Sequence, residues 1–329
     1  MPTAKEFLEN RQIFVYLVAV FLAAMTAMFV PRANALEIAI NPALAVMLFV
    51  TFLQVPLSEV GKACTNVRFL AALLAANFVV IPLLVVVLTK AFGVAPAAQV
   101  GVLLVLLTPC IDYVVVFAHL GRANSRLLLA TTPILLIAQL LLLPVFLGLF
   151  LGKDASRLIH VGPFVHAFIQ LIVIPLGLSG LFQAWASRSK LGEQLSASLG
   201  LLPVPATALV LFFVVASMAS KLGPTMNTAL QVAPIYIAFA VIAPLIGWMV
   251  GRLFNVDVSA GRSIAFSAGT RNSLVVLPLA LAVPQTTVSL PAIIITQTLV
   301  ELLSELLYVR WIPTLGQRRL PHSEKSLHS

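Results

Sequence analysis

The chain has 329 residues, of which 60% are hydrophobic and 9% are charged, and its formal net charge is +9. Soluble domains carry about 25% charged residues, so this composition excludes a soluble enzyme or binding module and indicates an integral membrane protein. The lysines and arginines stand singly in short loops. Membrane topology explains that distribution better than nucleic acid binding does, so we expect the lipid bilayer as a partner and no nucleic acid.

Apolar segments of membrane-spanning length follow one another along the chain, separated by short turns that carry charge, proline, glycine or asparagine. The first segment has no cleavage site before it and is expected to be retained. The sequence predicts an all-α polytopic protein with ten transmembrane helices in one domain, residues 1–329, ending in a cytoplasmic tail at 313–329. The helices are expected at 13–31, 40–58, 68–90, 97–121, 126–152, 160–187, 199–220, 229–252, 261–284 and 288–312.

Ten helices put both termini on one side of the membrane. When alternate loops are assigned to opposite sides, 14 lysines and arginines lie on the terminal side and 5 on the other, and Arg271 lies within a helix. The positive-inside rule then puts both termini in the cytoplasm. The expected location is a bacterial-type inner (plasma) membrane.

An internal repeat is visible when the chain is shifted against itself by 162 positions. The aligned pairs are Pro82 and Pro244, Phe92 and Phe254, Val94 and Val256, Ala98 and Ala260, and Thr108 and Thr270. Each half holds five expected helices, an odd number, so the halves must have opposite orientations. The sequence therefore predicts inverted repeats at 13–152 and 160–312, with the polar stretch 187–194 as a linker within one fold.

The fourth and ninth expected helices are interrupted. The fourth contains Thr-Pro-Cys-Ile-Asp at 108–112, and the ninth contains Ser-Ala-Gly-Thr-Arg-Asn-Ser at 267–273. Pro109 breaks the first and Gly269 the second, and each break frees backbone groups that must find partners. Paired broken helices mark the binding site of a secondary transporter, so we expect a small-molecule or ionic substrate here. A proline kink that only shapes a helix is the alternative.

Asp112 and Arg271 are the strongly ionisable residues well inside these two helices. Such residues at bilayer depth are functional candidates by default. If the helices cross, the two can form a structural ion pair, or Arg271 can attract an oxyanion while Asp112 serves as a proton or counter-ion site. The other candidate binding residues are polar: Asn77, Thr108, Ser267 and Asn272.

Polar residues elsewhere in the expected helices have simpler interpretations. Gln139 and Gln297 are expected to hydrogen-bond between helices. Glu301 and Glu305 are expected near the membrane interface, or paired with Arg310.

Cys110 directly follows the proline of the first break. A cation such as Arg271 would favour its thiolate, and thiolates bind soft elements such as trivalent arsenic. A small, inert hydrophobic residue is the alternative interpretation. The sequence has no paired-cysteine metal site, nucleotide-binding loop or catalytic triad, so we expect neither an enzyme nor a cofactor nor a metal.

The run from Thr108 to Asn124, TPCIDYVVVFAHLGRAN, resembles the fourth helix of the bile acid/sodium symporter superfamily. Its Pro-Cys start looks most like the arsenite-efflux branch, and the break at 269–273 extends the likeness. The resemblance implies a panel domain and a core domain, in which helices four and nine cross. In the arsenite branch Cys110 would be the residue essential for transport, whereas that branch's glutamate in helix nine corresponds to Val275 here.

The resemblance also bears on coupling. In the sodium-coupled branch the ion ligands correspond to Val114, Val115, Ser267 and Arg271, so most of them are absent here. Asn77 and Thr132 keep oxygen ligands. We therefore expect Arg271 to replace a bound ion, and protons to be favoured over sodium.

The leading hypothesis is a proton-coupled or uncoupled secondary transporter that exports arsenite, and antimonite as well, by alternating access. The alternative is a transporter of a small organic anion, with weakened or absent sodium coupling and Arg271 as the carboxylate partner.

Overall fold

The computed structural model describes residues 7–8, 11–30, 32–54, 66–111, 113–156, 169–273, 276 and 289–316. Every element in these ranges is a helix, and the one β-type contact among them is an isolated bridge. The prediction of an all-α chain is therefore confirmed for the part that the structure describes. Part of the sixth and most of the second half of the ninth expected helix fall outside these ranges.

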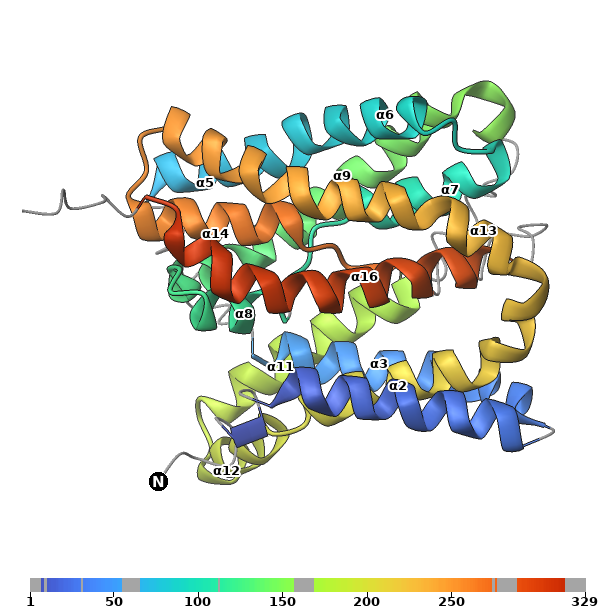
Figure 1. The fold of residues 1–329 in the computed structure, drawn as a ribbon. Coiled ribbons are helices and arrows are strands. Elements are labelled where there is room, and N and C mark those ends of the chain that lie inside the picture. The colour runs from blue at the N-terminus through green and yellow to red at the C-terminus, as the bar shows by residue number, and fades with distance from the viewer. Residues whose placement is uncertain are drawn as a thin grey trace, which may run out of the picture.

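The helices form two groups, one above the other in Figure 1. The lower one, here called the α2 group, also includes the first part of the long helix α13. Its elements are α2 (Gln12–Phe29), the 3-10 helix η1 (Ala33–Ala39), α3 (Ile40–Phe52), the π-helix η4 (Ile169–Val173), α11 (Ile174–Ala186), α12 (Lys190–Leu199) and α13 (Pro203–Leu253).

The upper one, here called the α14 group, includes the second part of α13. Its other elements are α5 (Val67–Ala75), the π-helix η3 (Ala76–Val80), α6 (Ile81–Ala91), α7 (Pro96–Leu106), α8 (Val114–Leu120), α9 (Ser125–Ser156), α14 (Val258–Gly269), α16 (Ser289–Trp311) and the 3-10 helix η5 (Ile312–Thr314). Helix α16 lies at the border, since Ile294 and Leu299 share a small void with Val20 of α2 and Leu211 of α13.

Helix α13 connects the two groups by curving from the lower to the upper one (Figure 1). The sequence predicted two helices here, at 199–220 and 229–252, and a linker at 187–194. The structure instead has one continuous helix of 51 residues. It also has helix α12, which begins in the expected linker, runs beyond its end, and is capped by Ser189, whose hydroxyl accepts from the Gly192 amide. A local serine cap is enough to start a helix in a polar stretch.

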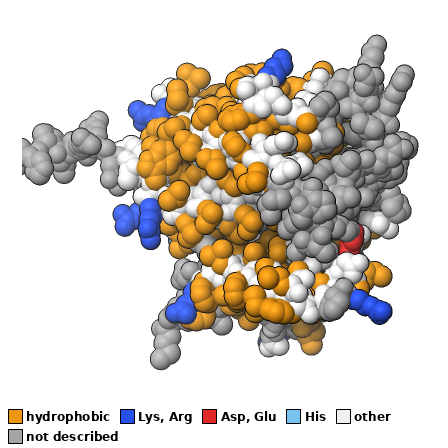
Figure 2. Space-filling model, turned by 45° about the vertical axis from the view of Figure 1, so that its right-hand side comes forward, with side chains coloured by type: hydrophobic (Ala, Val, Ile, Leu, Met, Phe, Trp, Pro, Cys, Tyr) orange, Lys and Arg blue, Asp and Glu red, His pale blue; other side chains and the backbone are white. Residues whose placement is uncertain are grey.

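The outer surface suits a lipid environment. Figure 2 shows one face on which hydrophobic side chains cover most of the described surface and lysines and arginines lie at its margins. Among the described residues four helical segments are long and apolar enough to cross a membrane, or up to six if each of two bent pairs is one span. The chain is thus a multi-pass membrane protein, while ten spans and an inverted repeat remain predictions.

Helices α13 and α14 pack closely through glycines. A Cβ added to Gly247 of α13 would lie 2.6 Å from the Cβ of Ala268 and 2.8 Å from the carbonyl oxygen of Ile264, both on α14. Gly251, one turn further along α13, similarly faces Gly261 of α14. Small residues spaced by four let membrane helices approach at backbone distance, and this contact fixes α14 and the break at its end.

Candidate functional site

The two interrupted helices meet at their breaks. Helix α7 ends at Leu106 and α14 ends at Gly269. Beyond these ends Pro109 and Arg271 form an antiparallel β-bridge. The Cys110 amide donates to the carbonyl oxygen of Thr270 over 3.1 Å, and the Asn272 amide donates to that of Thr108 over 2.9 Å. Because extended backbone inside a membrane needs internal partners, each break supplies the hydrogen bonds that the other requires.

The turns that lead into the two breaks have the same backbone form. Gly93 (φ +59°) follows α6 and Asn255 (φ +52°) follows α13, and both adopt the left-handed conformation. Just beyond the ends of α7 and α14, the hydroxyls of Thr108 and Thr270 each donate to the carbonyl oxygen four residues earlier, over 2.9 and 2.7 Å. These equivalences fall at the 162-residue offset, while the inverted repeat itself stays a prediction.

Arg271 is completely buried at the crossing. Its Nη2 donates to Asn77 Oδ1 at 2.8 Å and to the carbonyl oxygens of Ser267 at 2.6 Å and Ala268 at 2.7 Å. Its Nη1 donates to the carbonyl oxygen of Leu106 at 3.4 Å. These carbonyls belong to the last turns of α14 and α7, where helix dipoles are negative. The protein thus offsets the desolvation of this charge with helix ends and an amide.

Asn77 holds this arrangement from a third helix. It lies in the π-helical turn η3, and its Nδ2 donates to the Leu73 carbonyl at 3.1 Å and to Ser267 Oγ at 3.0 Å. Its Oδ1 is thereby turned toward Arg271. The structure therefore brings together three of the predicted site residues, Asn77, Ser267 and Arg271, in one buried network.

Cys110 lies next to this network. Its side chain is completely buried, forms no disulfide within the described part of the chain, and interacts electrostatically with Arg271. The neighbouring Ile111 lines a cavity, but neither Cys110 nor Arg271 does. The thiol therefore belongs to the residue that directly precedes a cavity-lining residue in the sequence, and it does not itself line the cavity.

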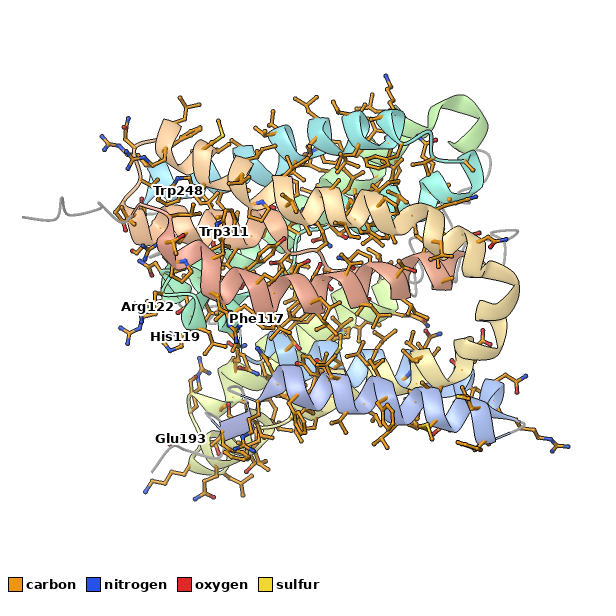
Figure 3. The ribbon with its side chains drawn as sticks, viewed as in Figure 1. Phe117, His119, Arg122, Glu193, Trp248 and Trp311 are labelled. Carbon is orange, nitrogen blue, oxygen red and sulfur yellow. The ribbon has the colours of Figure 1, made fainter. Side chains whose placement is uncertain are left out.

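This cavity, of about 410 Å³, lies between the two helix groups. The α14 group contributes the stretch after Cys110 and parts of α8 and α9; the α2 group contributes α2, the end of α3 and the start of α13. Figure 3 shows His119 between the groups, at the end of the molecule that also holds Arg122 and Glu193. None of the described lining residues is Lys, Arg, Asp or Glu. The polar ones are Gln12, Tyr16, Thr51, Gln54, Tyr113, His119, Ser125 and Thr207.

Glu301 and Glu305 are not interfacial, contrary to the prediction from the sequence. Both are buried in α16, and Glu301 accepts from the Arg271 amide at 2.8 Å, from the Tyr113 hydroxyl and from Gln297 Nε2. Among the described residues Gln297 thus bonds within its own helix and not to another one. The missed signal was the spacing: Gln297, Glu301 and Glu305 are four residues apart, which puts all three on one face of a helix.

Several other predictions have different outcomes. Asp112 and Val275 lie outside the described residues, so the pairing of Asp112 with Arg271 stays a prediction. The Thr132 hydroxyl donates to the Leu129 carbonyl at 2.7 Å within its helix. Gln139 is buried and its Oε1 has no partner among the described residues.

Interrupted helices that meet at their breaks inside a multi-pass membrane protein are the arrangement of secondary transporters. The sequence model of the Sodium Bile acid symporter family matches residues 41–228, more than half of the chain. The chain therefore belongs to this family of transporters, as the resemblance of its fourth helix predicted. The match includes the break at Pro109 and ends before that at Gly269. A search of curated proteins finds no match.

Proposed function

We propose that the protein exports arsenite, and also antimonite, across the inner membrane by alternating access. The observation that carries this proposal is a cavity whose described lining contains no Lys, Arg, Asp or Glu and whose wall includes the residue next to a buried thiol. Arsenous acid is a small neutral hydroxylated solute in neutral water. A described lining of hydroxyls, amides, one imidazole and apolar groups suits such a solute better than an ion, whose desolvation would be uncompensated.

Cys110 supplies the chemical selectivity in this proposal. Its sulfur displaces one hydroxyl of arsenous acid: an S–As bond forms, an As–O bond breaks, and the thiol proton leaves with the hydroxyl as water. Soft sulfur ligands suit arsenic. A single thiol keeps the bond reversible, as transport requires. Movement of the two helix groups relative to each other is what brings the thiol and the cavity together.

Sodium independence forms part of the same proposal. The guanidinium of Arg271 takes oxygens from Asn77, Ser267 and Ala268 that could otherwise ligate a cation. A fixed positive charge there repels a second cation at short range. Transport by this chain should therefore proceed equally in sodium and in choline buffers.

The organic-anion alternative has less support. Arg271, its expected carboxylate partner, points into the core of the α14 group and does not line the cavity. Uptake of radiolabelled carboxylates that is saturable and electrogenic in proteoliposomes would favour this alternative.

The test is arsenite accumulation in an arsenite-sensitive strain expressing the chain. Cells with the native protein should retain less arsenite than vector controls, and the Cys110→Ser variant should lose this effect. The matched control is Cys64→Ser, which removes the other cysteine of the sequence and should export normally. Export by Cys110→Ser at the native rate, with equal protein in the membrane, contradicts the thiol role. Equal retention by native and vector cells contradicts arsenite export altogether.

A further inference from the structure

Helix α16 carries a buried polar face that the proposed thiol chemistry does not use. Its residues are Gln297, Glu301, Ser304, Glu305 and Tyr308, all less than a tenth exposed. Polar and ionisable groups inside a membrane are costly and usually functional. The protonation states of the two carboxyl groups need an explanation, because each group is buried inside the protein.

The contact between Glu301 and Tyr113 admits two proton arrangements. The Tyr113 hydroxyl oxygen lies within hydrogen-bond distance of Glu301 Oε1 and at 3.2 Å from the Arg271 carbonyl oxygen. A hydroxyl has one hydrogen. When Glu301 is ionised, Tyr113 donates to the carboxylate. When Glu301 is protonated, its O–H donates to Tyr113, which then donates to the Arg271 carbonyl.

Glu305 has a different hydrogen balance. Its Oε1 lies 2.5 Å from Thr270 Oγ1, which also lies 2.7 Å from the Phe266 carbonyl oxygen. The one hydroxyl hydrogen of Thr270 can serve only one of these two contacts. When it is donated to the Phe266 carbonyl, which can only accept, the proton between Thr270 and Glu305 comes from the carboxyl group. Glu305 therefore fits the structure as a neutral acid.

The charged groups around Glu301 are compatible with this carboxyl group gaining and losing one proton. The titratable groups of the described residues that face it are Tyr113 from the start of α8, Arg271 and Cys110 from the crossing, Tyr236 from α13, and Glu305 and Tyr308 from its own helix. Arg271 is the cation of this set. With Glu305 neutral, the ionised Glu301 balances Arg271, and the protonated Glu301 leaves one net positive charge.

A second feature points to a small ligand beside this carboxyl group. A void of about 10 Å³ is lined by Glu301, Gln297 and Tyr236 among others. The Tyr236 hydroxyl and Gln297 Oε1 have no hydrogen-bond partner among the described residues, although their side chains are only 2% and 4% exposed. Such a void is of the order of one water molecule, ~10–15 Å³, and the two unpartnered polar atoms beside Glu301 are groups to which a water molecule could bind.

We propose that Glu301 is a proton-binding site that exchanges with the cavity through the Tyr113 hydroxyl, while Glu305 keeps its proton. Tyr113 is suited to this because it both lines the cavity and touches Glu301. The proton enters at the Tyr113 oxygen as the original hydroxyl hydrogen passes to Glu301, and it leaves by the reverse step. The inference deepens the proposed transport function by naming its coupling ion, but the site itself does not depend on arsenite as the substrate.

The test is infrared titration of the purified protein, read at the C=O stretch of protonated carboxyl groups, from about pH 5, where exposed carboxylates with pKa near 4 are already ionised. Of the described carboxyl groups, Glu301 should give an amplitude that titrates and Glu305 one that does not. Glu301→Gln should lose the titrating amplitude, and Glu305→Gln the constant one. Glu193→Gln, on exposed α12, should change neither.

Loss of the titrating amplitude in Glu305→Gln, or its survival in Glu301→Gln, overturns the proposal. If Glu301→Gln does not fold, Glu301→Asp withdraws the carboxyl group from Tyr113, and an unchanged titration midpoint then overturns it equally. Tyr113→Phe should keep the titrating amplitude but slow proton exchange. The titration is carried out without substrate. If Glu301 titrates but no arsenite flux is found, the proposed function is refuted and the proton-binding site is not.

Discussion

The guanidinium of Arg271 and the side-chain oxygen of Asn77 are 2.8 Å apart in the buried interior of the α14 group. This contact joins a helix from the first half of the chain to a helix break in the second half. The Asn77 oxygen is one of four described oxygens that accept from the Arg271 side chain, and none of the four belongs to a carboxylate. Replacing Arg271 should therefore show how much the stability of the fold depends on a buried cation.

Arg271→Ala should lower the free energy of unfolding by about 3 kcal/mol, because it leaves the Asn77 amide and helix-end carbonyls with unmet hydrogen bonds. The measurement is reversible unfolding in mixed detergent, followed by tryptophan fluorescence. Arg126→Ala, which removes an exposed arginine, is the control and should change stability by less than about 0.5 kcal/mol. Equal effects of the two substitutions would contradict the proposed role of the Arg271 contacts.

Gly247→Ala should destabilise the protein by about 1–3 kcal/mol, because the new methyl group meets α14 at backbone distance. Gly148→Ala is the matched control. Its Cβ has no heavy atom within 4 Å, so the higher helix propensity of alanine should stabilise the protein by up to about 1 kcal/mol. Opposite signs of the two changes in the same unfolding assay are the expected result; a stabilising Gly247→Ala would show that the two helices can separate freely.

Thr270→Val should cost about 1–3 kcal/mol, since it leaves the Glu305 carboxyl group without its hydroxyl partner. Thr108→Val is its counterpart in the first break, where the described partners of the hydroxyl are the carbonyls of Leu104 and Val105. That change should cost less than about 1 kcal/mol, and Thr270→Ser should restore most of the stability. Similar losses for both valine variants would argue against a special role for the Glu305 contact.

Asp257 should make stability depend on pH at the start of α14. Burial opposes its ionisation, but hydrogen bonds from the Ser259 hydroxyl and the Ala260 amide outweigh this and lower its pKa below the usual 3.8 of an aspartate. A lowered pKa in the folded state means that the contribution is present above the unfolded pKa and is lost as pH falls through the folded one.

Asp257→Ala should therefore cost about 1 kcal/mol at neutral pH through loss of the helix cap, and should reduce the decline in stability below about pH 4. Asp257→Asn keeps a capping oxygen and should restore stability at neutral pH while removing the same pH dependence. Unfolding midpoints at several pH values measure both effects. If the stability of Asp257→Asn falls at low pH as much as that of the native protein, other groups cause the pH dependence.

The sequence by itself determined the class of the molecule and the positions of its breaks. Apolar segments long enough to span a bilayer are visible in composition, because the lipid solvent selects for them directly. Pro109 and the Gly269 stretch were visible as interruptions because proline removes an amide and glycine favours a helix end. The local turns after α6 and α13 also follow from residues near each other in the chain.

The tertiary structure alone decided which polar groups meet. Helix α16 is apolar on several faces, and lipid is as apolar as a protein interior, so hydropathy does not tell which side of such a helix is buried. For this reason Glu301 and Glu305 looked interfacial in the sequence, although packing against α13 and the crossing encloses both. The partners of Arg271 were likewise hidden, because Asn77 and the ends of two helices come together only when the breaks cross.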